Sequence, residues 1–192
     1  MDTNARIRSS GDEEAFTLRE PVGKILCTDG RPMFRWRRNL AAEGTSALRV
    51  RVHWVAEGVD PVDIPTAERD EVAFPETGTK YPPLPRTTRI QWRLVYRDRF
   101  REVESEPHIF HLAPAMEVEQ VRQDLAVLEG SLVELRDVRG IEKLSAWLRA
   151  NLLERRRLFL DALHELETID GDDATVLARK THLRHLCRMD EE

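Results

Sequence analysis

Apolar and polar residues alternate along three segments in the first half of the chain. In residues 34–37, 48–54 and 90–97, large apolar side chains take every second position, and mostly polar side chains, many of them arginine, lie between. A period of two places alternate side chains on opposite faces of a strand. Each segment is therefore predicted to be a β-strand with one buried and one wetted face. Shorter strand candidates are residues 22–26, 70–74 and 108–112.

The connections between these strands indicate how they pair. They contain turn residues such as Asp29-Gly30 and Pro82-Pro83, and they show no helical pattern. Antiparallel strands can be joined by tight turns, whereas parallel neighbours need a long crossover that is usually a helix. Residues 21–114 are therefore predicted to form a small antiparallel β-sandwich.

The first 20 residues are interpreted differently. They mix charged residues with few apolar ones, and Phe16 and Leu18 are the residues that could anchor them. Chain ends with so little apolar surface are usually poorly ordered unless something holds them. Residues 1–20 are predicted to be a flexible N-terminal tail that a partner could order.

After Pro114 the period changes to that of an α-helix. All ten prolines lie between Pro21 and Pro114, and proline interrupts helices because it lacks a backbone donor. From residue 116 on, apolar residues recur at spacings of three and four, which places them on one helical face. This stripe consists of Val118, Val121, Leu125, Leu128, Leu132 and Leu135. A helix over 116–136 suits either packing within the chain or a coiled-coil contact between two copies.

Further helices are predicted over 141–157, over 158–169 and from residue 173 on. Gly140 and Gly171 separate them, and Asp172 or Asp173 is the expected N-cap of the last helix. The predicted fold class is α+β in separate regions: a β-sandwich over 21–114, followed by an α-helical hairpin or bundle over 115–192 with repeat-like character.

Charge and composition limit the classes of protein to which this chain is expected to belong. Residues 1–114 hold 18 Lys and Arg against 18 Asp and Glu, whereas residues 115–192 hold 12 against 17, so the net charge of −5 belongs to the helical region. No apolar run approaches the roughly 20 residues of a membrane span, and no secretory signal is recognised, so a cytoplasmic location without a membrane partner is expected. Cys27 and Cys187 suggest neither a disulfide framework nor a zinc motif, and no metal or cofactor is expected.

Four motifs of the β region resemble fibronectin type III-like domains. They begin with P-x-F-x-W at Pro32, Phe34 and Trp36, continue through the LRVRV strand at 48–52, and end in two further patterns. These patterns are W-R-L-x-Y at Trp92, Arg93, Leu94 and Tyr96, and S-E-P-x-x-F-x-L at Ser105, Glu106, Pro107, Phe110 and Leu112. The likeness is to the version found in bacterial regulatory proteins, including some anti-sigma factors. It implies a β-sandwich that serves as a scaffold or interaction module in signalling.

The helical region carries a second resemblance. Residues 148–180 look like a tetratricopeptide-type helical hairpin followed by the start of the next helix. A single repeat of this kind cannot bury its own apolar face. The resemblance therefore implies stacking on the 116–136 helix, on the sandwich or on another protein.

Arginines on the wetted strand faces are the first candidates for a binding surface. If the three alternating strands share one sheet, six guanidinium groups decorate one surface: Arg35, Arg37, Arg49, Arg51, Arg93 and Arg97. They could be neutralised by acidic residues of adjacent strands, or they could dock acidic protein, either this chain's own helices or a partner. Nucleic acid is a third reading, which the neutral charge of the region disfavours. In the helical region, Trp147 and Phe159 are further candidates for partner contact.

No catalytic motif is present. Ser105, Asp98 and His108 could form a triad only if the fold happened to bring them together, and His182, His185 and Cys187 do not share one helical face. The predicted function is a non-catalytic protein–protein interaction or regulatory module, with anti-sigma-like signalling as the family implies. The alternatives are a small structural component of a larger assembly and, after it, an enzyme or a nucleic-acid binder using the arginine face. A homo-oligomer formed through the 116–136 helix is also considered.

Overall fold

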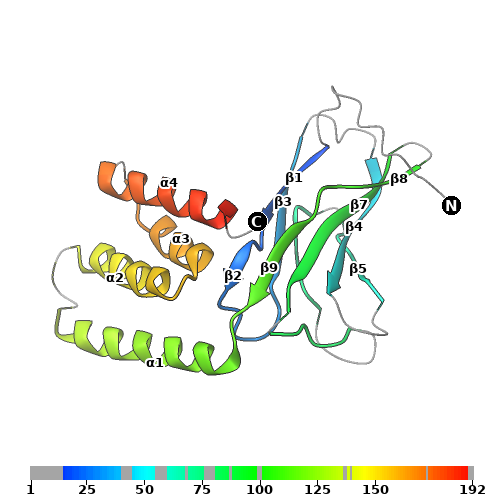
Figure 1. Ribbon diagram of the computed structural model, residues 1–192. Helices are drawn as coiled ribbons and strands as arrows, with labels where there is room; N and C mark the ends of the chain where they lie inside the picture. The colour runs from blue at the N-terminus through cyan, green and yellow to red at the C-terminus, as the bar shows by residue number, and fades with distance from the viewer. Residues whose placement is uncertain are drawn as a thin grey trace.

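The strands come first in the chain and the helices last. A computed structural model describes residues 15–39, 45–54, 60–67, 69–75, 81–86, 88–98, 101–135, 138, 140–171 and 173–189. Within these residues the strands β1 to β9 precede the helices α1 to α4 (Figure 1). The predicted mixture of a β region followed by a helical region is therefore confirmed.

Three strands form the smaller sheet, in the order β1-β3-β6 with antiparallel neighbours. They are β1 (Phe16–Glu20), β3 (Met33–Arg38) and β6 (Glu71–Ala73). The first strand corrects the predicted tail, which extended to residue 20. Phe16 and Leu18 point into the core, while Thr17 and Arg19 are exposed. These five residues thus alternate like the longer strands, and they pair with β3. Residues 1–14 of the predicted tail lie outside the described residues.

The larger sheet follows the order β2-β9-β7-β4-β5, and β8 also pairs with β7. Its strands are β2 (Gly23–Ile25), β4 (Thr45–Trp54), β5 (Val62–Pro65), β7 (Ile90–Asp98), β8 (Arg101–Glu104) and β9 (His108–Leu112). Neighbours are antiparallel except for β2 and β9, which run parallel. This pair departs from the wholly antiparallel prediction, because no hairpin joins β2 to β9 and no turn sets their relative direction.

Both sheets contribute side chains to one hydrophobic core. The rings of Phe34 in β3 and Trp92 in β7 have centroids 5.2 Å apart, and those of Phe16 and Tyr96 are 4.9 Å apart. Trp92 is completely buried, and its indole N–H donates to the carbonyl of Pro21 at 2.9 Å. Burying such large rings is the main stabilising contribution, since truncating one to alanine typically costs about 3–5 kcal/mol.

The helices agree with the segments predicted from the apolar period. They are α1 (Ala115–Leu132), continued by the 3₁₀ turn η2 (Val133–Leu135), then α2 (Ile141–Arg155), α3 (Phe159–Glu167) and α4 (Ala174–Met189). Asp173 caps α4, because its Oδ1 accepts from the N–H of Thr175 at 2.9 Å. Asp172, the alternative cap, lies outside the described residues.

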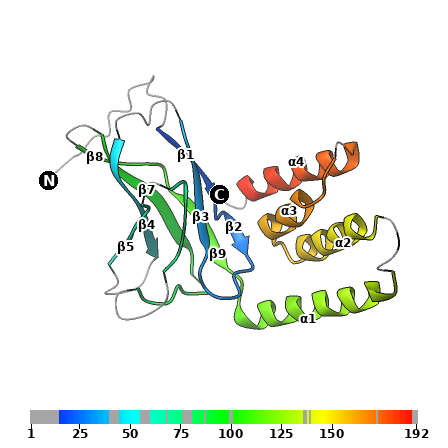
Figure 2. The same ribbon diagram turned by 180° about the vertical axis from the view of Figure 1, so that it is seen from behind.

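The helices gather on the side of the sheets where β2 lies, as both views show (Figures 1 and 2). α3 is central, since it packs against α2, α4 and β2. The helices share a second hydrophobic core around Leu158, Leu166 and Leu183, which Leu26 from the end of β2 joins. In the described part of the chain, none of the helices combines the length and apolar character that crossing a membrane requires.

Candidate protein-interaction surfaces

The six arginines predicted to form one surface lie on two different sheets. Arg35 and Arg37 belong to β3 of the smaller sheet, whereas the other four belong to β4 and β7 of the larger sheet. The premise of a shared sheet is therefore wrong. Alternation tells which face of its own strand a side chain takes, but it does not tell which strands are neighbours. The four on the larger sheet are Arg49, Arg51, Arg93 and Arg97.

An arginine–carboxylate ladder crosses the outer face of the larger sheet. Arg51 in β4 binds Asp63 of β5 through Nε at 2.8 Å and Glu104 of β8 through Nη1 at 2.6 Å. Its neighbours repeat the arrangement: Arg49 binds Asp63 and Glu102, and Arg93 binds Glu104. Three guanidinium groups thus meet three carboxylates. The ladder consists of Arg49, Arg51, Asp63, Arg93, Glu102 and Glu104.

The ladder is neutral and stays ionised. Hydrogen bonds from Arg51 and Arg49 hold the pKa of Asp63 below its usual value against the opposing effect of burial. This arrangement agrees with the interpretation that acidic residues of adjacent strands neutralise the arginines. Arg37 and Arg97 are exposed, and no ion pair between described residues includes either. They lie on different sheets, so they do not make a cationic patch suited to nucleic acid.

Polar contacts connect the helices to the sheets around β2. Lys24 binds Glu117 of α1 at 2.6 Å between Nζ and Oε1, and the N–H of Leu26 donates to Asp161 Oδ2 of α3 at 2.8 Å. Glu20 receives Arg35 Nη1 at 2.8 Å on one oxygen and lies 2.9 Å from His164 Nε2 on the other. Among the candidate arginines, Arg35 is thus linked to the chain's own helices through Glu20.

Burial and pairing shift the pKa values at this junction. Burial raises the pKa of Asp161 to about 6, although the bond from Leu26 opposes the rise. The hydrogen bond to Glu20 raises the pKa of His164. Burial also raises the pKa of Glu20, but the bonds and charges of His164 and Arg35 together outweigh it, so this pKa lies below its usual value.

The candidate contact residues of the helical region, Trp147 and Phe159, pack against the hydrophobic cores of the chain. Trp147 is half-buried against the helical core, and Phe159 packs against both hydrophobic cores. Neither belongs to the exposed large hydrophobic residues of the described chain. Part of each side chain stays accessible, so their role as partner contacts stays a prediction. An apolar helical position looks the same in sequence whether its neighbour is internal or external.

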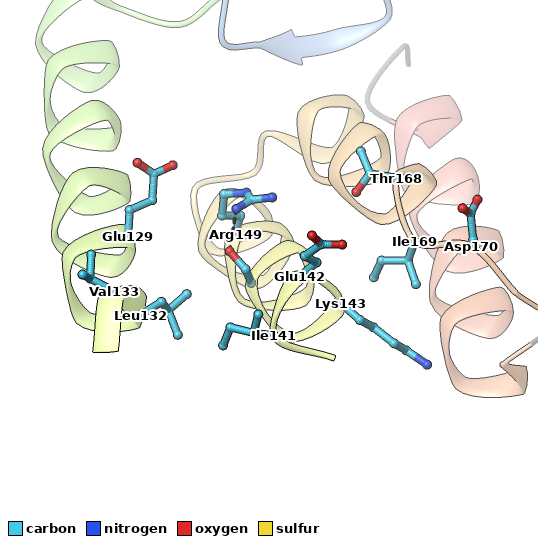
Figure 3. Close-up of a pocket in the computed structure, with 11 residues that line it drawn as sticks. Glu129, Leu132, Val133, Ile141, Glu142, Lys143, Arg149, Thr168, Ile169 and Asp170 are labelled. Carbon is cyan, nitrogen blue, oxygen red and sulfur yellow. Dashed lines mark hydrogen bonds between the residues drawn. The ribbon is translucent and has the colours of Figure 1, made fainter. Parts of the chain in front are cut away.

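A groove of about 590 Å³ lies along α2, between α1 on one side and the end of α3 on the other (Figure 3). We call it the helical groove. Its walls and floor come from three separate helical segments, and they mix apolar with charged side chains. The lining residues are Glu129, Leu132, Val133, Ile141, Glu142, Lys143, Ser145, Arg149, Thr168, Ile169 and Asp170.

The end of this groove, where α1 leads through η2 towards α2, is apolar and open. Val133 is 46% exposed, Leu135 40%, Val138 54% and Leu144 45%. Leu132 and Ile141 are half-buried and, with Val133, line the groove itself. Single exposed apolar residues are ordinary, whereas a contiguous group beside a concave surface is typical of an interaction site.

The charged groups of the groove fall into two kinds. Its basic groups are already paired within the chain: Lys143 with Asp173 at 2.5 Å, and Arg149 with Glu165 at 2.7 Å. Its acidic groups differ, since no side-chain ion pair or hydrogen bond between described residues includes Glu129, Glu142 or Asp170. The groove therefore combines an apolar end with carboxylates that no described residue pairs.

Sequence reasoning placed some groove residues on helical stripes but did not identify the groove. It placed Leu132 on the stripe of the 116–136 helix, which suited either packing within the chain or a contact between two copies. In the structure only Val121 of the 116–136 stripe is fully buried within α1. No signal in the sequence showed this, because the stripe of α1 packs against α2 and the spacing of apolar residues does not report how much of it α2 covers.

The residues considered for catalysis serve the backbone or the core. Ser105 Oγ accepts from the N–H of Leu94 at 3.0 Å and donates to the carbonyl of Glu106 at 3.1 Å. Burial lowers the pKa of His108 to about 4, and the side chain of Asp98 lies outside what the structure describes. Burial also raises the pKa of the Cys27 thiol to about 12. Among the described side chains, no group of three His, Cys, Asp or Glu is placed to hold a metal ion.

Comparison with known proteins adds no relative. The chain matches no protein-family model, and no curated protein shows significant similarity to it. The two resemblances noted in the sequence thus stand on their own motifs. A fold alone does not define a function, so the residues of the surfaces described above carry the functional information.

Proposed function

We propose that this chain is a non-catalytic protein-binding module and that the helical groove is its binding site. The observation that carries the proposal is the apolar stripe of α1 and α2, which is left partly open at the end of a concave surface. Leu132 and Ile141 border the groove, and Val133 and Leu144 are nearly half exposed. An amphipathic helix of a partner fits such a surface by placing apolar residues at helical spacing into the groove.

The remaining architecture would act as the scaffold for this site. We propose that the two sheets form a fibronectin type III-like sandwich, which is supported by the ring contacts between β3 and β7 and by the shared core. We further propose that α2 and α3 form a tetratricopeptide-like hairpin, supported by their packing and by the short connection over residues 156–158. A regulatory role of the anti-sigma-like kind would operate through binding at the groove.

The contacts between the two regions support a fixed groove. Lys24, Leu26 and Glu20 hold α1 and α3 from the side of the sheets. These contacts lie nearer the starts of α1 and α3 than the groove-lining residues do. They limit how the two helices can shift, which would lower the ordering free energy that binding requires.

Selection from a phage-displayed library of random peptides against the full chain tests this proposal. We expect enriched peptides with apolar residues at helical spacing, and we expect their binding to be lost in the variant Leu132→Glu/Ile141→Glu. A matched control, Val127→Glu, changes an exposed α1 residue that does not line the groove and should leave binding unchanged. Enriched peptides that bind both variants equally, or no enrichment at all, would contradict the proposal.

A further inference from the structure

We infer that the occupant of the helical groove is a basic amphipathic α-helix of another protein. This inference rests on the proposed function and adds the chemistry of the partner. It follows from a difference between the charged groups of the groove. The basic groups have ion-pair partners within the chain, whereas the acidic groups have none among the described residues.

The basic groups of the groove are not available as anchors for an acidic partner. Arg149 donates to Glu165 Oε2 at 2.7 Å and to Ser145 Oγ at 2.6 Å, and Lys143 donates to Asp173 at 2.5 Å. An acidic helix would have to displace carboxylates that already hold these cations. Such a helix would also bring its charge close to the acidic groups of the groove, and like charges disfavour binding.

The acidic groups of the groove, in contrast, are exposed and have no ion-pair partner among the described residues. Glu129 of α1, Glu142 of α2 and Asp170 after α3 are all exposed, and none takes part in a side-chain ion pair or hydrogen bond between described residues. Figure 3 shows Glu129 on one helix and Asp170 on the opposite side of the groove, with Glu142 between. Lysine or arginine side chains flanking the apolar stripe of a bound helix would meet carboxylates on both sides.

A second copy of this chain is a weaker candidate for the same reason. Of the five carboxylates on α1 and η2, three are paired within the chain: Glu117 with Lys24, Glu119 with Arg122, and Asp124 with Arg156. No ion pair between described residues includes the other two, Glu129 and Glu134. Pairing two such helices through the 116–136 stripe would bring these charges together. A partner with the same apolar spacing and basic flanks avoids this repulsion and gains attraction.

The test uses three synthetic peptides, each of the length of α1, and the full chain. The lysine peptide has leucine at i, i+3, i+4 and i+7 positions with lysine on both flanks. The glutamate peptide replaces every lysine by glutamate, and the scrambled peptide keeps the composition of the lysine peptide but not its spacing. Fluorescence anisotropy gives the Kd of each. We expect the lysine peptide to bind about tenfold or more tightly than either of the others, and its affinity to fall with added salt.

Charge variants separate groove binding from general attraction to an acidic protein. Glu129→Lys is expected to weaken binding of the lysine peptide about five- to tenfold. Asp60→Lys changes the net charge by the same amount as Glu129→Lys, but at an exposed residue that precedes β5 and does not line the groove. This variant should leave the Kd within about twofold. The double variant Glu129→Lys/Glu142→Lys should favour the glutamate peptide. Equal weakening by Glu129→Lys and Asp60→Lys would overturn the inference.

The remaining outcomes distinguish this inference from the proposed function. If the glutamate peptide binds as tightly as the lysine peptide and Leu132→Glu/Ile141→Glu abolishes both, the partner chemistry is wrong and the groove remains a binding site. If no designed or library-selected peptide depends on Leu132 and Ile141, the proposed function fails as well. Sedimentation equilibrium showing a dimer that Leu132→Glu/Ile141→Glu dissociates would identify a second copy as the occupant and overturn the inference.

Discussion

His164 in α3 and Glu20 at the end of β1 lie 144 residues apart in sequence, yet His164 Nε2 is 2.9 Å from Glu20 Oε1. Arg35 holds the second oxygen of the same carboxylate at 2.8 Å. The sheets and the helices are therefore joined by a contact whose strength depends on protonation.

The pH dependence of this contact has a defined sign. The pKa of His164 is raised above 6.5 by its bond to Glu20, so its stabilising contribution is complete below about pH 6.5 and is lost as pH rises through the raised value. The pKa of Glu20 lies below 4.5, so its contribution is present above that pH and is lost as pH falls. The ion pair between His164 and Glu20 is therefore strongest between the lowered pKa of Glu20 and the raised pKa of His164.

Replacing His164 by Gln keeps a hydrogen-bond donor but removes the titration. We expect the free energy of unfolding at pH 6 to fall by no more than about 1 kcal/mol, because His164 is partly exposed and solvent screens the pair. The difference from the unmodified chain should disappear at pH values above the raised pKa of His164. Urea unfolding across this range measures it. A deficit that persists unchanged at high pH would show that packing, rather than charge, explains the effect.

Asp161→Asn tests the buried carboxyl that accepts from Leu26. Burial raises the pKa of Asp161 from 3.8 to about 6, so ionisation destabilises the fold progressively as pH rises through this range. Asparagine keeps an acceptor oxygen without the charge. Stability should therefore depend less on pH between about 4 and 6, by at most about 3 kcal/mol over that interval.

The companion variant Asp161→Ala removes the acceptor altogether. The partly buried N–H of Leu26 then loses its partner in the chain, which should cost about 1 kcal/mol at every pH. Chemical denaturation of both variants separates the two effects. An unchanged pH profile in Asp161→Asn would contradict the assigned titration.

Arg51→Ala tests the arginine–carboxylate ladder on the larger sheet. Arg51 binds both Asp63 and Glu104, so its removal leaves the two carboxylates to Arg49 and Arg93. We expect a loss of about 1 kcal/mol that is smaller in high salt, because partly exposed pairs are screened. The Kd of the lysine peptide should not change. A variant that folds normally but loses the peptide would assign binding to this face instead.

Gly130→Ala tests the marginal stability of α1. Gly130 lies inside the helix, and a Cβ built on it meets no atom within 4 Å. Alanine loses less backbone entropy on folding than glycine, so the substitution should stabilise the chain by about 0.5–1 kcal/mol. Thermal unfolding measures the change. A decrease in melting temperature would indicate that Gly130 is needed for close approach to a neighbour.

The spacing of apolar residues predicted where the strands and helices lie, but it did not predict which strands pair with one another. Alternation identified β3, β4 and β7, and the helical period identified α1 to α4, because these signals depend only on side-chain direction within one element. The division of the arginine strands between two sheets depends on long-range pairing. Nothing in the spacing of Arg35 or Arg51 reports which strand lies beside it.

The candidate site shows the same limit. The stripe from Val118 to Leu135 was recognised as apolar, but the fraction of it that is covered depends on how α2 packs against α1. Nothing in the sequence singled out Glu129 or Glu142, because their lack of a described partner becomes visible only when the ion pairs of Lys143 and Arg149 are known.

Amide hydrogen exchange of the full chain, with and without the lysine peptide, tests the central claim most directly. Exchange reports, amide by amide, where binding protects the backbone. We predict protection concentrated in residues 128–135 and 141–149, with exchange in strands β4, β5 and β7 unchanged. Protection over those strands, or saturation with peptide without any change along α1 and α2, would contradict the assignment of the helical groove as the binding site.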